Sequence, residues 1–162
     1  MSAIEILTLP AEPDSVLANE ARLLFRDYRA FLENTRSCGT HIPKLDREIE
    51  ELPTPYASFG GDVLLAQVDG QAAACIAYRA TPDAGTCEIK RLFVRPTFRG
   101  LGLARQLVLA AIEQAKSRGY TRAILDTDAN TMPSALALYL SLGFRPYMPD
   151  QGNLSFLELR LV

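Results

Sequence analysis

The stretch Arg95-Pro-Thr-Phe-Arg99-Gly100-Leu101-Gly102-Leu103-Ala104-Arg105 is the most informative part of this sequence. It follows an apolar run and opens a helical pattern, so it is predicted to join a strand to a helix. Two glycines at such a junction let the backbone approach a ligand closely, and the first N–H groups of a helix have no partner inside it. Together with the helix dipole, these features predict an anion site suited to phosphate.

The charges around this junction favour the same interpretation. The whole chain has a net charge of −2. Five cations nevertheless lie within sixteen positions, namely Lys90, Arg91, Arg95, Arg99 and Arg105. Neither of two familiar phosphate motifs fits, because the dinucleotide-binding fingerprint needs a third glycine where Arg105 stands and a P-loop needs Gly-Lys-Ser/Thr. The alternative is structural: the glycines form a tight turn and the arginines form a solvated face.

Length and composition fit one globular domain over residues 1–162. Hydrophobic residues make up 48% and charged residues 22% of the 162 residues, which are ordinary values for a soluble protein. The apolar runs are too short to cross a bilayer, and the first five residues show no secretory leader, so no membrane partner is expected. The slightly acidic charge argues against general nucleic-acid binding.

Cysteine and histidine are too few and too scattered for a metal site or a disulfide framework. Cys38, Cys75 and Cys87 form no CxxC motif, and His41 is the only histidine. A structural zinc site needs four nitrogen or sulfur ligands, so no metal is expected. A hydrolase with a histidine base would have to use His41, which lies in a segment predicted to be a loop. The odd number of cysteines indicates the reducing cytoplasm.

Periodicity and turn signals predict an α+β domain with a mixed sheet. The strands are expected at residues 4–8, 63–68, 71–79, 86–94, 123–127, 144–147 and 154–161. The helices are expected at 14–33, at 46–52, from 101 to just before Gly119, and from Pro133 to just before Gly143, with Thr131 as the last helix's cap. Residues 34–44 are predicted to be a loop.

Three motifs in order resemble the GCN5-related N-acetyltransferase (GNAT) superfamily. Arg99-Gly-Leu-Gly102-Leu-Ala104 is similar to its Arg/Gln-x-x-Gly-x-Gly/Ala signature, Leu92-Phe-Val94 resembles its bulged fourth strand, and residues 135–144 resemble its second motif. The run from Cys87 to Val94 also resembles one bacterial subgroup of the family. The resemblance implies the acyl-CoA N-acyltransferase fold, a mixed, mostly antiparallel sheet of about seven strands flanked by about four helices.

The resemblance also implies acetyl-coenzyme A (acetyl-CoA) as co-substrate. In the family, the loop and helix start hold the pyrophosphate, and the backbone of the bulged strand pairs with pantetheine. The implied contacts are Leu92, Phe93, Val94, Arg99, Gly100, Leu101, Gly102, Leu103, Ala104 and Arg105. Many members have Asn where Met132 stands here, and Asn130 is the candidate replacement.

Acetyl transfer from a thioester to an amine needs few groups. The amine must lose a proton, the leaving thiolate must gain one, and the carbonyl oxygen needs a hydrogen-bond donor. Tyr139 matches the family tyrosine that protonates the sulfur, and the phenol pKa of about 10 lies above that of a thiol. Glu88 matches the base of histone-type members, and the Val94 N–H is the family's donor to the carbonyl oxygen. The alternatives are a core aromatic at Tyr139 and a structural Glu88–Lys90 ion pair.

The acceptor side is less determined by the sequence. In this fold, roughly residues 28–60 shape the acceptor pocket. The candidate lining residues are Tyr28, Phe31, His41, Tyr56 and Phe59, each of which core packing also explains. Four acids, Asp46, Glu48, Glu50 and Glu51, are interpreted as the charged outer face of a short helix rather than as an amine-binding patch.

The function predicted from these features is direct N-acetylation of a primary amine by acetyl-CoA, without an acyl-enzyme. The expected acceptor is a small molecule, with a protein amino terminus or lysine as the alternative. A non-catalytic acyl-CoA sensor and a structural domain with a decayed site are the alternatives. A homodimer is an expectation from the family alone, since no coiled-coil pattern is present.

Overall fold

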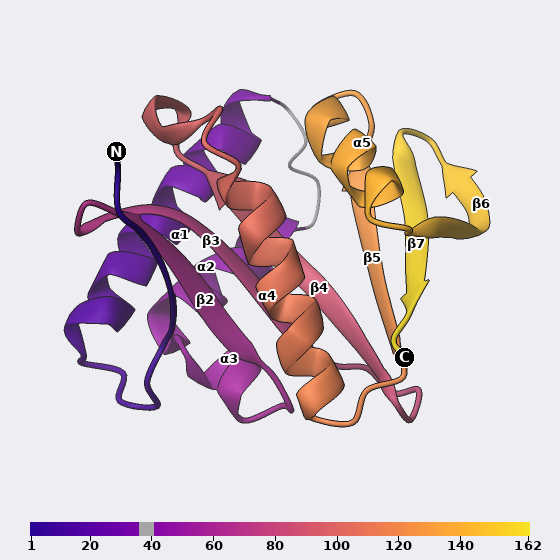
Figure 1. The fold of residues 1–162 in the computed structure, drawn as a ribbon, viewed down its shortest axis with the longest axis horizontal. Helices are drawn as coiled ribbons and strands as arrows, with labels where there is room; N and C mark the ends of the chain where they lie inside the picture. Colours follow the sequence, from indigo (N-terminus) through magenta and orange to yellow (C-terminus); the bar gives the residue numbers. More distant parts are fainter. Residues whose placement is uncertain (36–40) are drawn as a thin grey trace.

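The computed structural model describes residues 1–35 and 41–162 and contains one seven-stranded sheet (Figure 1). The elements are β1 (Ile4–Thr8), α1 (Val16–Asn34), α2 (His41–Glu51), α3 (Thr54–Ala57), β2 (Asp62–Val68), β3 (Gln71–Ala80), β4 (Thr86–Val94), a 3-10 turn (Pro96–Phe98), α4 (Leu103–Ser117), β5 (Arg122–Asp128), α5 (Pro133–Ser141), β6 (Arg145–Gln151) and β7 (Leu154–Arg160). The strand order is β1-β2-β3-β4-β5-β7-β6, and only the β4–β5 pair is parallel. The predicted mixed, mostly antiparallel α+β fold is confirmed.

The helices differ from the prediction at three places. α3 was missed, because its four residues are too few to show a helical period. α2 begins at His41 and not at Asp46, so residues 41–44 are helical, and Pro43 lies in the first turn, where proline is tolerated. Asn34 is the last residue of α1 and Thr35 its cap, while residues 36–40 of the predicted loop, including Cys38, lie outside the described residues. α1 begins later than predicted, because the Ser15 hydroxyl accepts a hydrogen bond from Ala18 N at 3.0 Å and caps the helix.

Helices cover both faces of the sheet (Figure 1). One apolar cluster packs α4 against the sheet through Leu103, Leu107, Val108, Ala111 and Ile112. A second cluster on the other face joins α1 and α2 to it through Leu24, Phe25, Leu45 and Phe93. None of the helices described is long and apolar enough to cross a membrane. The sheet is thus buried on both sides over β2 to β4, as its nearly continuous apolar strands require.

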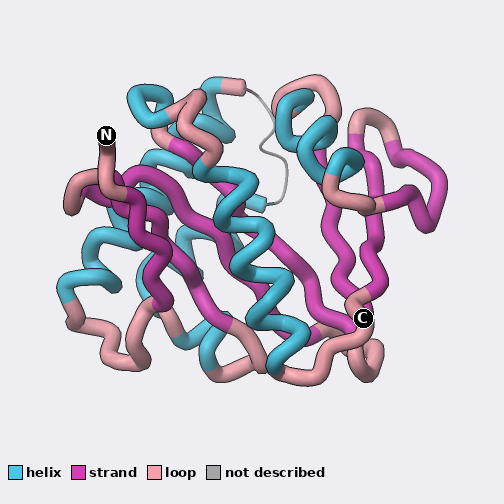
Figure 2. Tube along the Cα trace, in the orientation of Figure 1, coloured by secondary structure: helices cyan, strands magenta, loops and turns pink. Residues whose placement is uncertain are grey.

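β4 and β5 separate partway along their length, and this separation creates the site. Only Thr86–Glu88 of β4 pair with Arg122–Ile124 of β5. Beyond these residues the strands diverge, so that β5, β7 and β6 form a wing of the sheet beside α5 (Figure 2). The edge of β4 from Ile89 to Val94 consequently faces a gap instead of a strand. Its backbone N–H groups on that side have no strand to pair with and can bind another partner.

Candidate active site

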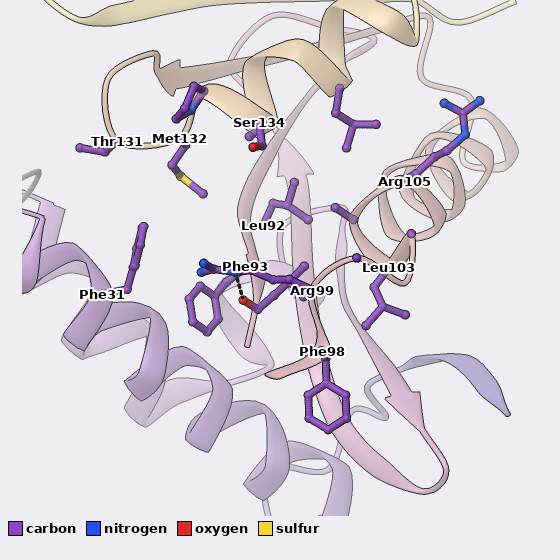
Figure 3. Close-up of a pocket in the computed structure, with 17 residues that line it drawn as sticks. Phe31, Leu92, Phe93, Phe98, Arg99, Leu103, Arg105, Thr131, Met132 and Ser134 are labelled. Atoms are coloured by element: carbon purple, nitrogen blue, oxygen red, sulfur yellow. Dashed lines mark hydrogen bonds between the residues drawn. The ribbon is translucent and has the colours of Figure 1, made fainter. Parts of the chain in front are cut away.

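A cleft of about 460 Å³ opens where β4 and β5 diverge (Figure 3). The end of β4 forms its floor, the 3-10 turn and the start of α4 form one wall, and the start of α5 forms the other. The lining residues are Phe31, Leu92, Phe93, Val94, Phe98, Arg99, Gly100, Gly102, Leu103, Ala104, Arg105, Thr131, Met132, Pro133, Ser134, Ala135 and Leu138. Most of these side chains are apolar, so the charged atoms at the α4 end stand out.

The two glycines before α4 have the backbone geometry that the sequence suggested. Gly100 has φ +84° and Gly102 has φ +76°, a left-handed conformation that glycine adopts without strain. A Cβ placed on either residue would meet no atom within 4 Å, so the protein leaves the space beside them open.

The start of α4 supplies free hydrogen-bond donors beside these glycines. The first helical bond runs from Gln106 N to Gly102 O at 3.1 Å, and Gly102 has no side chain to cap the helix. The N–H groups of Leu103, Ala104 and Arg105 donate to no residue that the structure describes. Because α4 has 15 residues, its dipole adds positive potential at this end. The helix start is therefore suited to a phosphate group.

The predicted cluster of five cations is divided in the structure, which corrects the expectation. Only Arg99 and Arg105 line the cleft. The Arg99 guanidinium lies over the Phe31 ring at 6.0 Å, and its Nε donates to Val94 O at 3.3 Å. Arg95 instead pairs with Asp27 of α1 at 2.7 Å. The other two cations, Lys90 and Arg91, lie earlier on β4, well before its end at Val94, and do not line this cleft.

A bulge in β4 turns Arg91 into the protein. Cys75 of β3 is opposite Phe93, but Ala77 is opposite Lys90, so β4 has an extra residue there. Arg91 has φ +62°, which is unusual for a residue with a side chain. Arg91 is only 7% exposed, so its guanidinium needs a buried anionic partner.

Glu48 of α2 is that partner, so its assignment to an outer helix face was wrong. Its two carboxylate oxygens accept hydrogen bonds from Arg91 Nε at 3.0 Å and Nη2 at 2.9 Å. The Tyr56 hydroxyl donates to the same carboxylate. Burial opposes ionisation, but the hydrogen bond and the charge of Arg91 hold the pKa of Glu48 below its ordinary value. The pair connects α2 to the bulge beside the cleft.

The free edge of β4 carries backbone donors toward the cleft. On the other edge, Arg95 N donates to Ala73 O of β3 at 2.9 Å. Because successive N–H groups of a strand point to opposite edges, the N–H groups of Val94 and Leu92 are directed toward the cleft. An extended ligand could therefore pair with β4 in the way that a neighbouring strand would.

A second cavity of about 660 Å³ continues the first one toward α1 and β5. Both are lined by Leu92, Thr131, Met132 and Ala135. Tyr139 lies in this second cavity, 5% exposed, with its ring edge-on to Phe144 at 5.6 Å. Burial, together with Tyr28 and Asp126, raises the pKa of Tyr139. Its phenol therefore keeps its proton at neutral pH and has the state of a general acid.

Glu88 and Lys90 line the same cavity on one face of β4. Lys90 Nζ lies 3.9 Å from Glu88 Oε1, so the ion pair proposed as the structural alternative is present. Burial and the neighbouring charge of Arg91 lower the pKa of Lys90, while Glu88 raises it. Glu88 both pairs with Lys90 and lines the cavity. The structure is therefore compatible with Glu88 as the catalytic base and as a structural ion-pair partner.

The remaining candidate residues are divided between the cavities and other places. Tyr28 lines the second cavity, and Phe31 lines the first. Phe59 is 61% exposed, and Tyr56 is fully buried beside Glu48. The side chain of His41 lies outside the described part of the chain. Leu101 and Asn130 line neither cavity.

The turn before α5 differs in detail from the prediction. Met132 occupies the position before the helix and provides no side-chain cap, so Thr131 is not the cap. Asp128 Oδ1 instead accepts hydrogen bonds from Asn130 N at 2.9 Å and Thr131 N at 3.2 Å. This arrangement places Thr131 and Met132 in both cavities, and Met132 stands where many family members have Asn. Over the described residues, no group of three His, Cys, Asp or Glu could hold a metal ion.

Residues 23–144 match the model of the acetyltransferase (GNAT) family. The chain belongs to this family. An uncharacterized N-acetyltransferase of Schizosaccharomyces pombe is 38% identical to this GNAT protein over 108 residues, covering 64% of the chain and 66% of the relative. The N-acetylaspartate synthetase of Homo sapiens is 35% identical over 117 residues, covering 72% of the chain and 36% of the relative. The match thus spans just under two thirds of the first relative and about a third of the second.

The fold of this GNAT protein is also found among solved structures. The PaiA N-acetyltransferase of Thermoplasma acidophilum, solved in complex with coenzyme A, superposes with a TM-score of 0.73. It covers 98% of this chain and 99% of its own, at 17% sequence identity. At that identity the likeness concerns the fold.

Proposed function

We propose that residues 1–162 form one N-acetyltransferase domain, which transfers an acetyl group from acetyl-CoA directly to the primary amine of a small molecule. The observation that carries this proposal is the pair of joined cavities. One end has open helix donors and Arg99, and the other has Tyr139 and Glu88. Membership in the GNAT family and the names of the relatives support the same activity.

The α4 end of the cleft would bind the pyrophosphate of acetyl-CoA. The N–H groups of Leu103, Ala104 and Arg105 would donate to its oxygens, and Arg99 and Arg105 would supply positive charge. The N–H groups on the free edge of β4 would pair with the amides of the pantetheine arm. This direction brings the thioester toward Leu92 and Ala135, where the two cavities meet.

At this junction the protein would supply the three groups that the transfer needs. The Val94 N–H donates to the carbonyl oxygen as it gains negative charge. The amine nitrogen bonds to the carbonyl carbon, the carbon–sulfur bond breaks, and Tyr139 gives its proton to the departing sulfur. The proton of the amine passes to Glu88, directly or through water. Asn130 and Leu101 have no contact that assigns them a part in these steps.

The two cysteines that the structure describes support direct transfer rather than an acyl-enzyme at either of them. Cys75 and Cys87 are fully buried, and burial raises their pKa to about 12 and about 11. A thiol with so high a pKa is a poor nucleophile at neutral pH. The reducing cytoplasm as location, and a homodimer, stay predictions.

Tyr139→Phe tests the function and separates an enzyme from an acyl-CoA sensor. We expect turnover to fall about a hundredfold, because the leaving thiolate loses its proton donor, while the affinity for acetyl-CoA is unchanged. Thiol release measures the first and titration calorimetry the second. Tyr147→Phe is the matched control, because Tyr147 lies on β6 outside both cavities. Full turnover in Tyr139→Phe would contradict its role as acid, and no binding of acetyl-CoA at millimolar concentration would end the proposal.

A further inference from the structure

The second cavity has charges of opposite sign on its two walls. Arg79 of β3 and Lys90 of β4 lie on one side, and Asp126 of β5 lies on the other. Glu88 and the exposed Lys44 of α2 line the cavity as well, and two further charged residues are already engaged. Arg91 is paired with Glu48, and Asp128 holds the turn before α5.

Strand register places these charges on one face of the sheet. Arg79 is opposite Glu88, and Glu88 is opposite Ile124. Residues two positions apart on a strand share a face, so Lys90 and Asp126 extend from that row. They lie on strands that have begun to separate, and the ligand space lies between them.

These charges are poorly compensated within the protein. Arg79 lies over the Tyr56 ring at 5.5 Å and forms no ion pair with the described carboxylates. Among the residues described, Lys90 has only Glu88 as an ion-pair partner, at 3.9 Å. Asp126 is exposed and, in the described ranges, has no cationic partner. Burial and the cations Arg91 and Arg79 lower the pKa of Lys90, which indicates a site that an added anion would stabilise.

We infer that the acceptor is an amine that also carries a carboxylate, as an amino acid does. Arg79 and Lys90 bind its carboxylate, and Asp126 holds its ammonium group beside Tyr139. The carboxylate of the acceptor competes with Glu88 for the ammonium group of Lys90. Glu88 is then free to accept the proton of the acceptor's amine. Lys44 also lines the cavity, so three cations that are not held by a close carboxylate face one free acid, and this balance fits a ligand with charges of both signs better than a plain alkylamine. The inference rests on the proposed function and names its substrate class.

Matched acceptors test the inference. The twenty common L-amino acids and β-alanine are assayed by thiol release, and each active compound is compared with its carboxamide. The carboxamide keeps the amine and the side chain but lacks the negative charge. We expect kcat/KM for the acid to exceed that for its carboxamide at least tenfold. Equal or better turnover of carboxamides or of simple alkylamines overturns the inference.

Calorimetry on the protein saturated with coenzyme A gives a second readout that needs no turnover. We expect an acid to bind at least tenfold more tightly than its carboxamide, and equal affinities overturn the inference. Absence of coenzyme A binding in the same titration is instead a failure of the proposed function, so the two failures are distinguishable.

Substitutions on the cationic wall assign the carboxylate to its residues. Lys90→Met and Arg79→Met should each raise KM for the acid at least tenfold and abolish the preference over the carboxamide, with KM for acetyl-CoA unchanged. Lys90→Arg keeps the charge and should keep the preference. Lys116→Gln is the control, because Lys116 lies on α4 outside both cavities. A preference that survives in both methionine variants overturns the assignment.

Discussion

Arg91 combines two costs at one position, a left-handed backbone and a buried charge. A non-glycine residue in this conformation costs about 1–3 kcal/mol, and a buried guanidinium without a partner costs more. The paired carboxylate of Glu48 offsets the second cost and fixes the side chain in place. The bulge that directs the end of β4 toward the cleft thus depends on a contact with α2.

Removing one member of this pair should be strongly destabilising. We expect Arg91→Met to lower the free energy of unfolding by about 3–5 kcal/mol, because Glu48 is left as an uncompensated buried charge. Urea denaturation measures the change. Arg29→Gln breaks the exposed ion pair with Asp46 and is the control, for which we expect almost no change. Similar losses in the two variants would contradict the buried pair's importance.

The pair also gives stability a defined pH dependence. The pKa of Glu48 is lowered in the folded protein, so the unfolded chain binds the proton more readily. The contribution is therefore complete above the unfolded glutamate pKa of about 4.3 and is lost as the pH falls through the folded value. Between pH 5 and more acidic pH, Glu48→Gln should lose less unfolding free energy than the wild-type protein, because glutamine has no carboxylate that takes up this proton. Equal slopes would exclude Glu48 as a contributor.

At the scale of an element, α4 is flanked by two glycines that have similar backbone conformations but differ in their position relative to the cleft. Gly102 precedes the helix with φ +76°, and Gly119 follows it with φ +91°. A Cβ on either would meet no atom of the protein within 4 Å. Gly102 lines the cleft and Gly119 does not. The left-handed backbone therefore favours glycine equally at both ends of α4. Only at Gly102 can a bound ligand also require that no side chain is present.

Substituting each glycine separates the two requirements. Gly102→Ala and Gly119→Ala should both lower the free energy of unfolding by about 1 kcal/mol, from the left-handed conformation. Only Gly102→Ala should weaken acetyl-CoA binding, at least tenfold, because its methyl group enters the space that we propose for the pyrophosphate. Gly102→Val, with a larger side chain, should abolish binding. Calorimetry and thermal unfolding measure the two effects, and equal affinities in the two alanine variants would contradict this account.

At the scale of the molecule, local sequence patterns were enough to predict the strands but not to predict which charges lie free in the site. All seven strands were predicted, and the limits of β4 agree because turn formers bound it on both sides. Glu48 was misassigned, because its partner Arg91 lies 43 positions away and no local pattern joins them. The division of the cations, the place where β4 and β5 stop pairing and the cavity lining by Met132 all depend on tertiary contacts. The sequence motifs could identify the helix start, but not which charges remain free beside it.

The short pairing between β4 and β5 bears on how the two parts of the sheet move relative to each other. Only three residues on each strand join the wing of β5, β7 and β6 to the rest of the sheet. A pantetheine arm bonded along β4 would act as a partial substitute strand and brace the two halves. Hydrogen exchange should then slow at the amides of Leu92 and Val94 when coenzyme A is added, and stay unchanged at Leu64 in the interior of the sheet. Unaltered exchange along β4 would mean that the arm follows another route and that coenzyme A adds no stiffness to the protein.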